Sequence, residues 1–160
     1  MRALSENAYA DLAYSIASSD TYPSWGYMVS RGATTIWELW NGDTADPAMN
    51  SRNHVMLLGD LIIWMYEYLG GIRPAEPGFR RIEVAPLMPE GLEHVAVTYK
   101  SPCGPVSNRW ERKDGAFRMQ LSVPAGVEAI VRLPFKAKCG SMVSDSFELG
   151  SGNYEFFANY

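Results

Sequence analysis

The sequence has little that marks a membrane protein or a nucleic-acid-binding protein. Its most apolar run, residues 55–69, is interrupted by Gly59, Asp60 and Glu67, so it is too short and too polar to span a bilayer. The net charge is −4, and no stripe of lysine or arginine is present. We therefore expect neither a membrane nor a nucleic acid as a partner.

Cysteine is scarce as well. Cys103 and Cys139 are the only two, and they fit no metal-binding spacing. They are compatible with two free buried thiols or with one disulfide bond, and the sequence does not decide between these. The first residues also lack the cationic head and the continuous apolar stretch of a signal peptide. We expect a soluble chain with no metal and no other cofactor.

The composition is that of a folded protein. The chain has 160 residues, of which 47% are hydrophobic, and this length allows one ordinary domain or two small ones. The pattern of apolar residues changes near Arg73. We therefore predict an α+β protein, with helices in residues 1–73 and a sheet in residues 74–160.

Two helices are predicted in the first part. Ser5 is a candidate N-cap for a helix whose apolar residues recur at helical spacing, namely Leu12, Ala13, Ile16 and Ala17. Asn50 or Ser51 is expected to cap a second helix that ends at the glycines after Leu69. The predicted buried stripe of that helix is Val55, Leu58, Ile62, Met65, Tyr66 and Leu69.

The long segment between these helices, residues 19–50, is rich in glycine, proline and aromatic residues. A loop of this length in a compact domain usually has a function. A short helix is predicted within it, over residues 33–40. Asp43 and Asp46 are interpreted as solvated turn residues.

After Pro77 the apolar residues alternate, which predicts short strands. Asp114-Gly115 is a hairpin signal, His94 is predicted on the surface and Trp110 in the core. The expected strands are residues 81–84, 95–99, 106–110, 117–123 and 129–133, with a last hairpin from 146 to 157. This spacing is typical of an antiparallel β-sandwich.

The chemistry of the chain centres on Glu38. It stands between Trp37 and Trp40, and His54 follows at the start of the apolar segment. Aromatic rings stack on the apolar faces of sugars, and a carboxylate can act on an anomeric centre or on an attacking water. A carbohydrate-active site is therefore the leading hypothesis.

These blocks resemble a known family. The stretches YPSWGYMV, GATTIWELWNG and MNSRNHVMLLGDLIIWMYEYLGGI are similar to the end of the catalytic domain of glycoside hydrolase family 78, the α-L-rhamnosidases. The later segments around Pro77-Gly-Phe79, Tyr99–Gly104 and Val131-Arg-Leu-Pro134 resemble the small β-sandwich that follows that domain.

The resemblance implies a fold and a mechanism. The catalytic domain would be an (α/α)6 toroid, of which this chain holds the last helices, and the enzyme would invert the anomeric configuration. Glu38 would be the general base, and His54 would contact rhamnose. Trp25, Trp37 and Trp40 would line the pocket. The implied substrate is a rhamnose-containing glycoside or polysaccharide.

The resemblance is incomplete in one respect. The general acid of the family lies upstream, and no part of this chain matches that region. The chain is thus expected to be a C-terminal piece that is inactive alone, with uncovered apolar helix faces that are hidden by self-association or by the sandwich. The alternative is a non-catalytic carbohydrate-binding or scaffold remnant.

Overall fold

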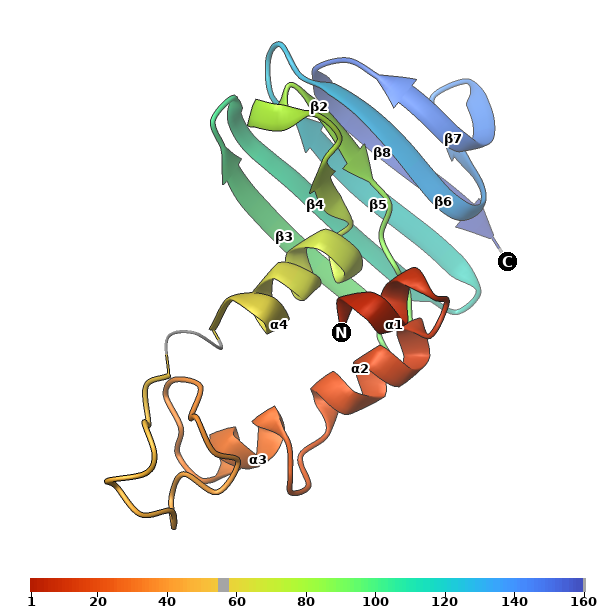
Figure 1. Ribbon diagram of the computed structural model, residues 1–160. Coiled ribbons are helices and arrows are strands. Elements are labelled where there is room, and N and C mark those ends of the chain that lie inside the picture. Colours follow the sequence, from red (N-terminus) through yellow and green to blue (C-terminus); the bar gives the residue numbers. More distant parts are fainter. Residues whose placement is uncertain (55–57, 160) are drawn as a thin grey trace. The chain divides into compact units, whose positions relative to one another are not determined.

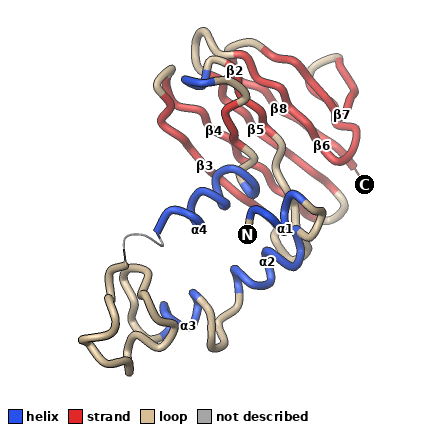
Figure 2. The backbone as a smooth tube through the Cα atoms, in the orientation of Figure 1, coloured by secondary structure: helices blue, strands red, loops and turns tan. Residues whose placement is uncertain are grey.

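The computed structural model describes residues 1–54 and 58–159. The chain forms two compact units, Met1–Trp64 and Met65–Tyr160. In Figure 2 all the strands belong to the second unit, whereas the first is built from helices and loops. The predicted α+β class is confirmed, and the change from helix to strand occurs at Ile72, where the first strand begins.

The helices of the first unit are α1 (Arg2–Glu6), α2 (Ala10–Ser18), α3 (Trp25–Ser30) and α4 (Leu58–Trp64) (Figure 1). Helix α2 was predicted, but the N-cap at Ser5 is wrong. Ser5 lies inside α1, where it is buried, and its hydroxyl accepts a hydrogen bond from the indole N–H of Trp64. Tyr9 precedes α2 instead.

Helix α3 was not predicted, whereas the helix predicted over residues 33–40 is absent from this described segment. Ser24 starts α3, because its side chain accepts a hydrogen bond from the backbone N–H of Tyr27. Residues 35–39 are non-helical because their backbone and side chains bond to residues 50–54 instead.

Residues 51–54 are not helical, so the N-cap predicted at Asn50 or Ser51 is wrong; α4 is described from Leu58. A π-helix, η2 (Met65–Leu69), follows α4 directly. Gly70 and Gly71 end the helix as predicted, and Gly71 has a φ of 72°, the left-handed conformation that glycine adopts easily.

The buried stripe predicted for this helix is only partly right. Leu69 is buried and Tyr66 half-buried, but Ile62, 49% exposed, and Met65 are exposed. Trp64 and Tyr68 are buried in their place. Val55 and the side chain of Leu58 lie outside what the structure describes.

The second unit contains eight strands and the short 3₁₀-helix η3 (Pro77–Phe79). The strands are β1 (Ile72–Pro74), β2 (Arg81–Val84), β3 (His94–Ser101), β4 (Gly104–Lys113), β5 (Ala116–Val123), β6 (Glu128–Cys139), β7 (Met142–Leu149) and β8 (Gly152–Asn159). Their order in the sheet is β1-β2-β6-β8-β5-β4-β3, and β7 pairs with β6.

The predicted strands all lie within observed ones, and the Asp114-Gly115 turn joins β4 to β5 with both residues at positive φ. Two features differ from the prediction. The pair β2–β6 is parallel. Strand β6 also continues beyond Leu133, through Pro134 and a shift in its register with β7.

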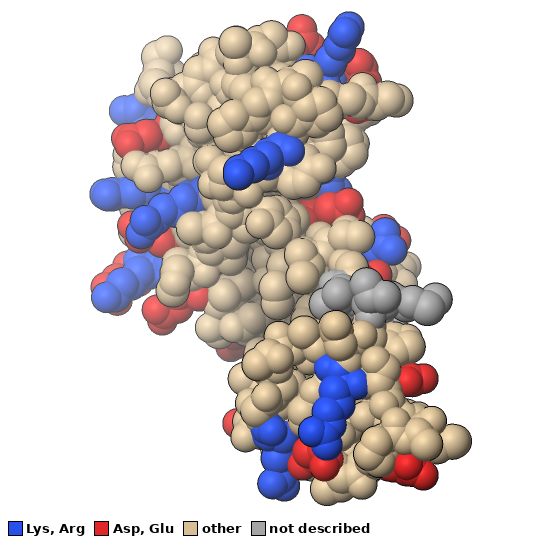
Figure 3. Space-filling view, turned by 90° about the vertical axis from the view of Figure 1, so that its left-hand side faces the viewer, with Lys and Arg blue, Asp and Glu red and all other residues tan. Residues whose placement is uncertain are grey.

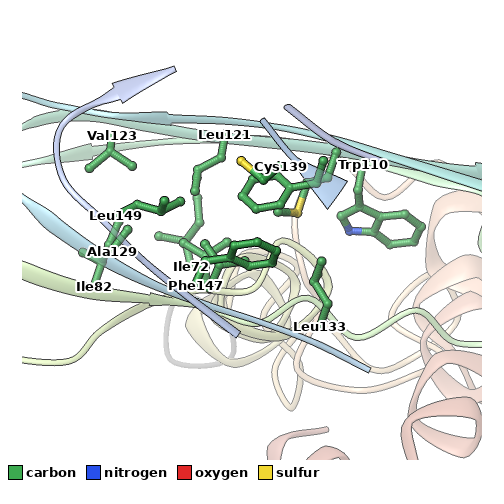
Figure 4. Packing of buried hydrophobic residues seen from close by; sticks show 14 of the residues in the cluster. Ile72, Ile82, Trp110, Leu121, Val123, Ala129, Leu133, Cys139, Phe147 and Leu149 are labelled. Carbon is green, nitrogen blue, oxygen red and sulfur yellow. The ribbon is translucent and has the colours of Figure 1, made fainter. Parts of the chain in front are cut away.

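The core of this unit lies between two layers of the curled sheet. In Figure 4, Leu121 and Val123 of β5 lie opposite Ile82 of β2 and Ala129 of β6. Trp110 is fully buried and donates a hydrogen bond of 2.8 Å to the carbonyl of Leu69, so its predicted place in the core is confirmed.

Candidate active site

The site predicted around Glu38 lies in the loop region of the first unit. Two segments that are distant in sequence run side by side there. The N–H of Glu38 donates to the carbonyl of Ser51, and the N–H of His54 donates to the carbonyl of Ile36, both at 2.9 Å. The hydroxyl of Thr35 donates to a further carbonyl in the second segment at 2.6 Å. These bonds bring Glu38 and His54 together.

The carboxylate of Glu38 is held by one oxygen. The N–H of Ser51 donates to Oε2 at 3.0 Å, and Nδ1 of His54 lies 3.7 Å from the same oxygen, longer than a hydrogen bond. No described residue donates a hydrogen bond to Oε1. The side chains of Glu38 and His54 are 41% and 25% exposed. A main-chain N–H of the facing segment therefore holds one oxygen of a carboxylate whose side chain is partly exposed.

The three tryptophans divide into two groups. Trp25, the first residue of α3, and Trp40 pack edge to face with ring centroids 5.6 Å apart. Trp40 is 38% exposed, so it retains surface for a ligand, whereas Trp37 is only 4% exposed. A Cβ added at Gly42 would lie 2.8 Å from the Trp37 ring, so Trp37 packs closely against the Gly42 backbone. This burial favours a packing role for Trp37.

The segment that follows Glu38 is fastened by polar side chains. Asn50 accepts a hydrogen bond from the N–H of Leu39 at 3.1 Å and donates to the carbonyl of Gly42 at 3.4 Å. Arg52 donates to the carbonyls of Gly42 at 3.0 Å and Asp43 at 3.2 Å. The run MNSRNH is visibly polar in the sequence, but its pattern does not predict these contacts.

Other predicted surface residues can now be placed. Asp43 was interpreted as solvated, which is wrong: it is half-buried, and Arg31 lies 3.7 Å from its carboxylate. Asp46 is a turn residue as predicted, because its carboxylate accepts a hydrogen bond from the N–H of Ala48. His94 begins β3 and is exposed, as predicted.

The cysteine question is settled by the structure, since Cys103 and Cys139 are both free thiols. Burial raises the pKa of Cys139. Across residues 1–54 and 58–159, no group of three His, Cys, Asp or Glu side chains is arranged to hold a metal ion. None of the described helices combines the length and apolarity needed to cross a membrane.

Charges of both signs are interspersed on the face drawn in Figure 3. A separate groove of about 690 Å³ crosses β3, β4, β5 and β8 in the strand unit. Its polar lining includes Thr98, Ser107, Arg109, Gln120, Ser122, Asn153 and Glu155.

Two family models match the chain. Residues 1–69 match the bacterial α-L-rhamnosidase six-hairpin glycosidase domain, and residues 71–148 match the bacterial α-L-rhamnosidase C-terminal domain. An α-L-rhamnosidase of Streptomyces avermitilis is 34% identical over 172 aligned residues, which cover 96% of this chain and 16% of the relative. One of Formosa agariphila is 37% identical over 136 residues, covering 82% of this chain and 15% of the relative.

Solved structures of α-L-rhamnosidases are also similar to this chain. The α-L-rhamnosidase of Dictyoglumus thermophilum has a TM-score of 0.89 and 32% identity, covering 99% of this chain and 20% of that one. The Streptomyces avermitilis enzyme complexed with L-rhamnose also has a TM-score of 0.89 and 32% identity. The match covers 99% of this chain and 17% of that one. This chain thus spans about a sixth of the length of the two curated relatives.

Proposed function

Because the chain belongs to the bacterial α-L-rhamnosidase family, we propose that it serves in an inverting glycoside hydrolase that removes terminal α-L-rhamnosyl residues. Residues 1–73 would complete the six-hairpin catalytic domain, and residues 74–160 would form the β-sandwich that follows it. The substrate class is a rhamnose-containing glycoside or polysaccharide, in keeping with a relative whose structure is a complex with L-rhamnose.

In this proposal Glu38 is the general base. Its Oε2 is held by the N–H of Ser51, while Oε1 receives a proton from the attacking water. The proposal rests on one observation: the carboxylate of Glu38 is partly exposed, and a main-chain N–H bonds only its Oε2 among the described residues. An inverting enzyme places its acid about 6.5–9.5 Å from the base, which leaves room for that water. The acid would come from a segment outside these 160 residues.

The surrounding residues would bind the sugar. His54 would contact rhamnose, since its ring nitrogen lies beside the carboxylate of Glu38. Trp25 and Trp40 would form an aromatic wall, because Trp40 retains exposed ring surface. Trp37 would support that wall from within the packed loop.

The test measures release of nitrophenol from a nitrophenyl α-L-rhamnoside. The samples are the complete gene product, its Glu38→Gln variant and this chain alone. Glutamine keeps the shape of the side chain but cannot take a proton from water, so kcat should fall at least ~100-fold. Azide should partly rescue the variant and give the inverted glycosyl azide. Glu93→Gln, at an exposed position of the strand unit, is the matched control.

A second function is favoured by one observation, the polar groove across the sheet. Hydroxyl, amide and charged groups of this kind would suit a carbohydrate-binding module. A Glu38→Gln enzyme that hydrolyses rhamnoside as fast as the parent would reject Glu38 as the base. Sugar binding by the strand unit, with no turnover by the complete gene product, is the separate outcome that would support the binding module.

A further inference from the structure

Glu38 is held in place by an irregular loop. The segment that carries it and the facing segment around Ser51 are both outside the described helices and strands. Among residues 34–40 and 50–54, all of which the structure describes, two backbone hydrogen bonds join the segments, from Glu38 to Ser51 and from His54 to Ile36. The position of the Ser51 N–H, and with it the direction of the carboxylate, therefore depends on whatever else fastens the segments together.

The residues on either side of Ser51 supply that fastening. Asn50 reaches the N–H of Leu39, next to Glu38, and the carbonyl of Gly42. Arg52 reaches the same Gly42 carbonyl at 3.0 Å and the following carbonyl at 3.2 Å. These four side-chain bonds all end on the main chain of residues 39–43.

We propose that Asn50 and Arg52 are positioning residues, which act through Ser51 to orient the carboxylate of Glu38. The inference rests on the proposed function of Glu38 as general base. Neither side chain needs to touch the substrate. Together they form a clamp that keeps the Ser51 N–H 3.0 Å from Oε2 and leaves Oε1 pointing to the attacking water.

The expected kinetic signature is specific. A misplaced catalytic group slows the chemical step, and a shift of about 1 Å can cost up to ~100-fold. Sugar binding by other side chains is less affected by such a shift. Loss of one clamp residue should therefore lower kcat about 10-fold while KM changes less than about twofold.

The test is a double-mutant cycle in the complete gene product with a nitrophenyl α-L-rhamnoside. Asn50→Ala and Arg52→Ala are made in the parent and again in the Glu38→Gln background. If both residues act through the carboxylate, their effects on kcat should nearly vanish once that carboxylate is gone. Met49→Ala is the control, because Met49 is adjacent in sequence and 73% exposed.

A conservative variant distinguishes loss of the hydrogen bonds from misfolding. Arg52→Lys keeps a donor that can reach one of the two carbonyls, so it should retain more activity than Arg52→Ala. Circular dichroism and the melting temperature verify that each variant is folded. If the alanine variants do not fold, Arg52→Lys and Asn50→Ser carry the same cycle.

The outcomes separate the two hypotheses. Two outcomes would overturn the clamp and leave Glu38 as the base. Either the clamp variants keep full kcat, or each lowers kcat by the same factor in the Glu38→Gln background as in the parent. A Glu38→Gln enzyme with unchanged turnover would reject the proposed base, and the clamp with it. The clamp would be supported if the clamp variants lower kcat in the parent, which retains Glu38, but not in the Glu38→Gln background, with KM nearly constant in both.

Discussion

The hydroxyl of Ser5 accepts a hydrogen bond of 2.8 Å from the indole Nε1 of Trp64, and both side chains are buried. The bond joins α1 to α4 within the first unit, across 59 positions of sequence. Trp64 is almost fully buried, so its N–H has no access to water. Ser5 of α1 is therefore part of the packed interior of this unit.

Replacement of Ser5 by alanine should destabilise the first unit. The variant leaves the Trp64 N–H buried without an acceptor, which costs about 1–3 kcal/mol. Urea unfolding followed by tryptophan fluorescence measures this change. Ser18→Ala is the control, because Ser18 bonds to a carbonyl on an exposed part of α2 and should change stability by less than about 0.5 kcal/mol.

Two glycines should respond in opposite ways to alanine. Gly42→Ala places a methyl 2.8 Å from the Trp37 ring, so the ring or the loop must shift, at a cost of about 1–3 kcal/mol. Gly59 lies in α4, where, among the described residues, an added methyl meets Ile63 at 3.6 Å, an ordinary van der Waals contact. Gly59→Ala should raise stability by up to about 1 kcal/mol. Equal effects in the two unfolding curves would contradict this account of the loop.

The buried thiol of Cys139 should make stability fall at alkaline pH. Burial raises the pKa of Cys139 above its ordinary value of 9.0, so the folded chain keeps the proton to a higher pH than the unfolded chain does. The contribution of this thiol to the free energy of unfolding is fully present below the pKa that it has in the unfolded chain. It is lost as the pH rises through the pKa that it has in the folded chain.

Unfolding measured in steps from about pH 8 to pH 10 should therefore show a steeper loss for the parent chain than for Cys139→Ala. Cys103, which is half-buried, should react faster than Cys139 with a thiol reagent in the folded protein. Identical pH slopes for the parent and Cys139→Ala would count against the shift.

The 160-residue chain alone should self-associate. Apolar side chains are exposed on both α2 and the helix around Ile62, among them Leu12, Ile16, Ile63 and Met65. Exposed apolar surface of this kind favours association. Sedimentation should show a mass that rises with concentration. A strict monomer that also fails to bind a hydrophobic dye would contradict the prediction.

The strand unit was well predicted because its signal is local. Along β5, Phe117, Met119, Leu121 and Val123 alternate with polar residues and point into the core. Asp114-Gly115 marks its turn in sequence. The parallel pair β2–β6 was missed, because the partner of a strand in a distant part of the chain leaves no mark on its own pattern.

The first unit was predicted less well for a related reason. The contacts of Asn50 and Arg52 join backbone groups across an irregular loop, and such contacts have no period in the sequence. Helix α4 buries Trp64, whose indole N–H bonds to Ser5 of α1, and a contact with a distant part of the chain does not show in the local pattern. Glu38 and His54 lie close together in the structure, and both belong to blocks that carry the family resemblance.

The two histidines of the chain provide a direct comparison for sugar binding. His54 lies 3.7 Å from Oε2 of Glu38, whereas His94 is exposed at the start of β3 in the other unit. If His54 contacts rhamnose, His54→Ala in the complete gene product should raise KM for a nitrophenyl rhamnoside at least ~10-fold, because a polar contact to substrate is lost. His94→Ala should leave KM and kcat within about twofold of the parent. Inhibition by free L-rhamnose separates binding from chemistry, since its inhibition constant should rise in step with KM for His54→Ala only. Equal KM values for the two variants would show that His54 supports the loop but does not bind the sugar.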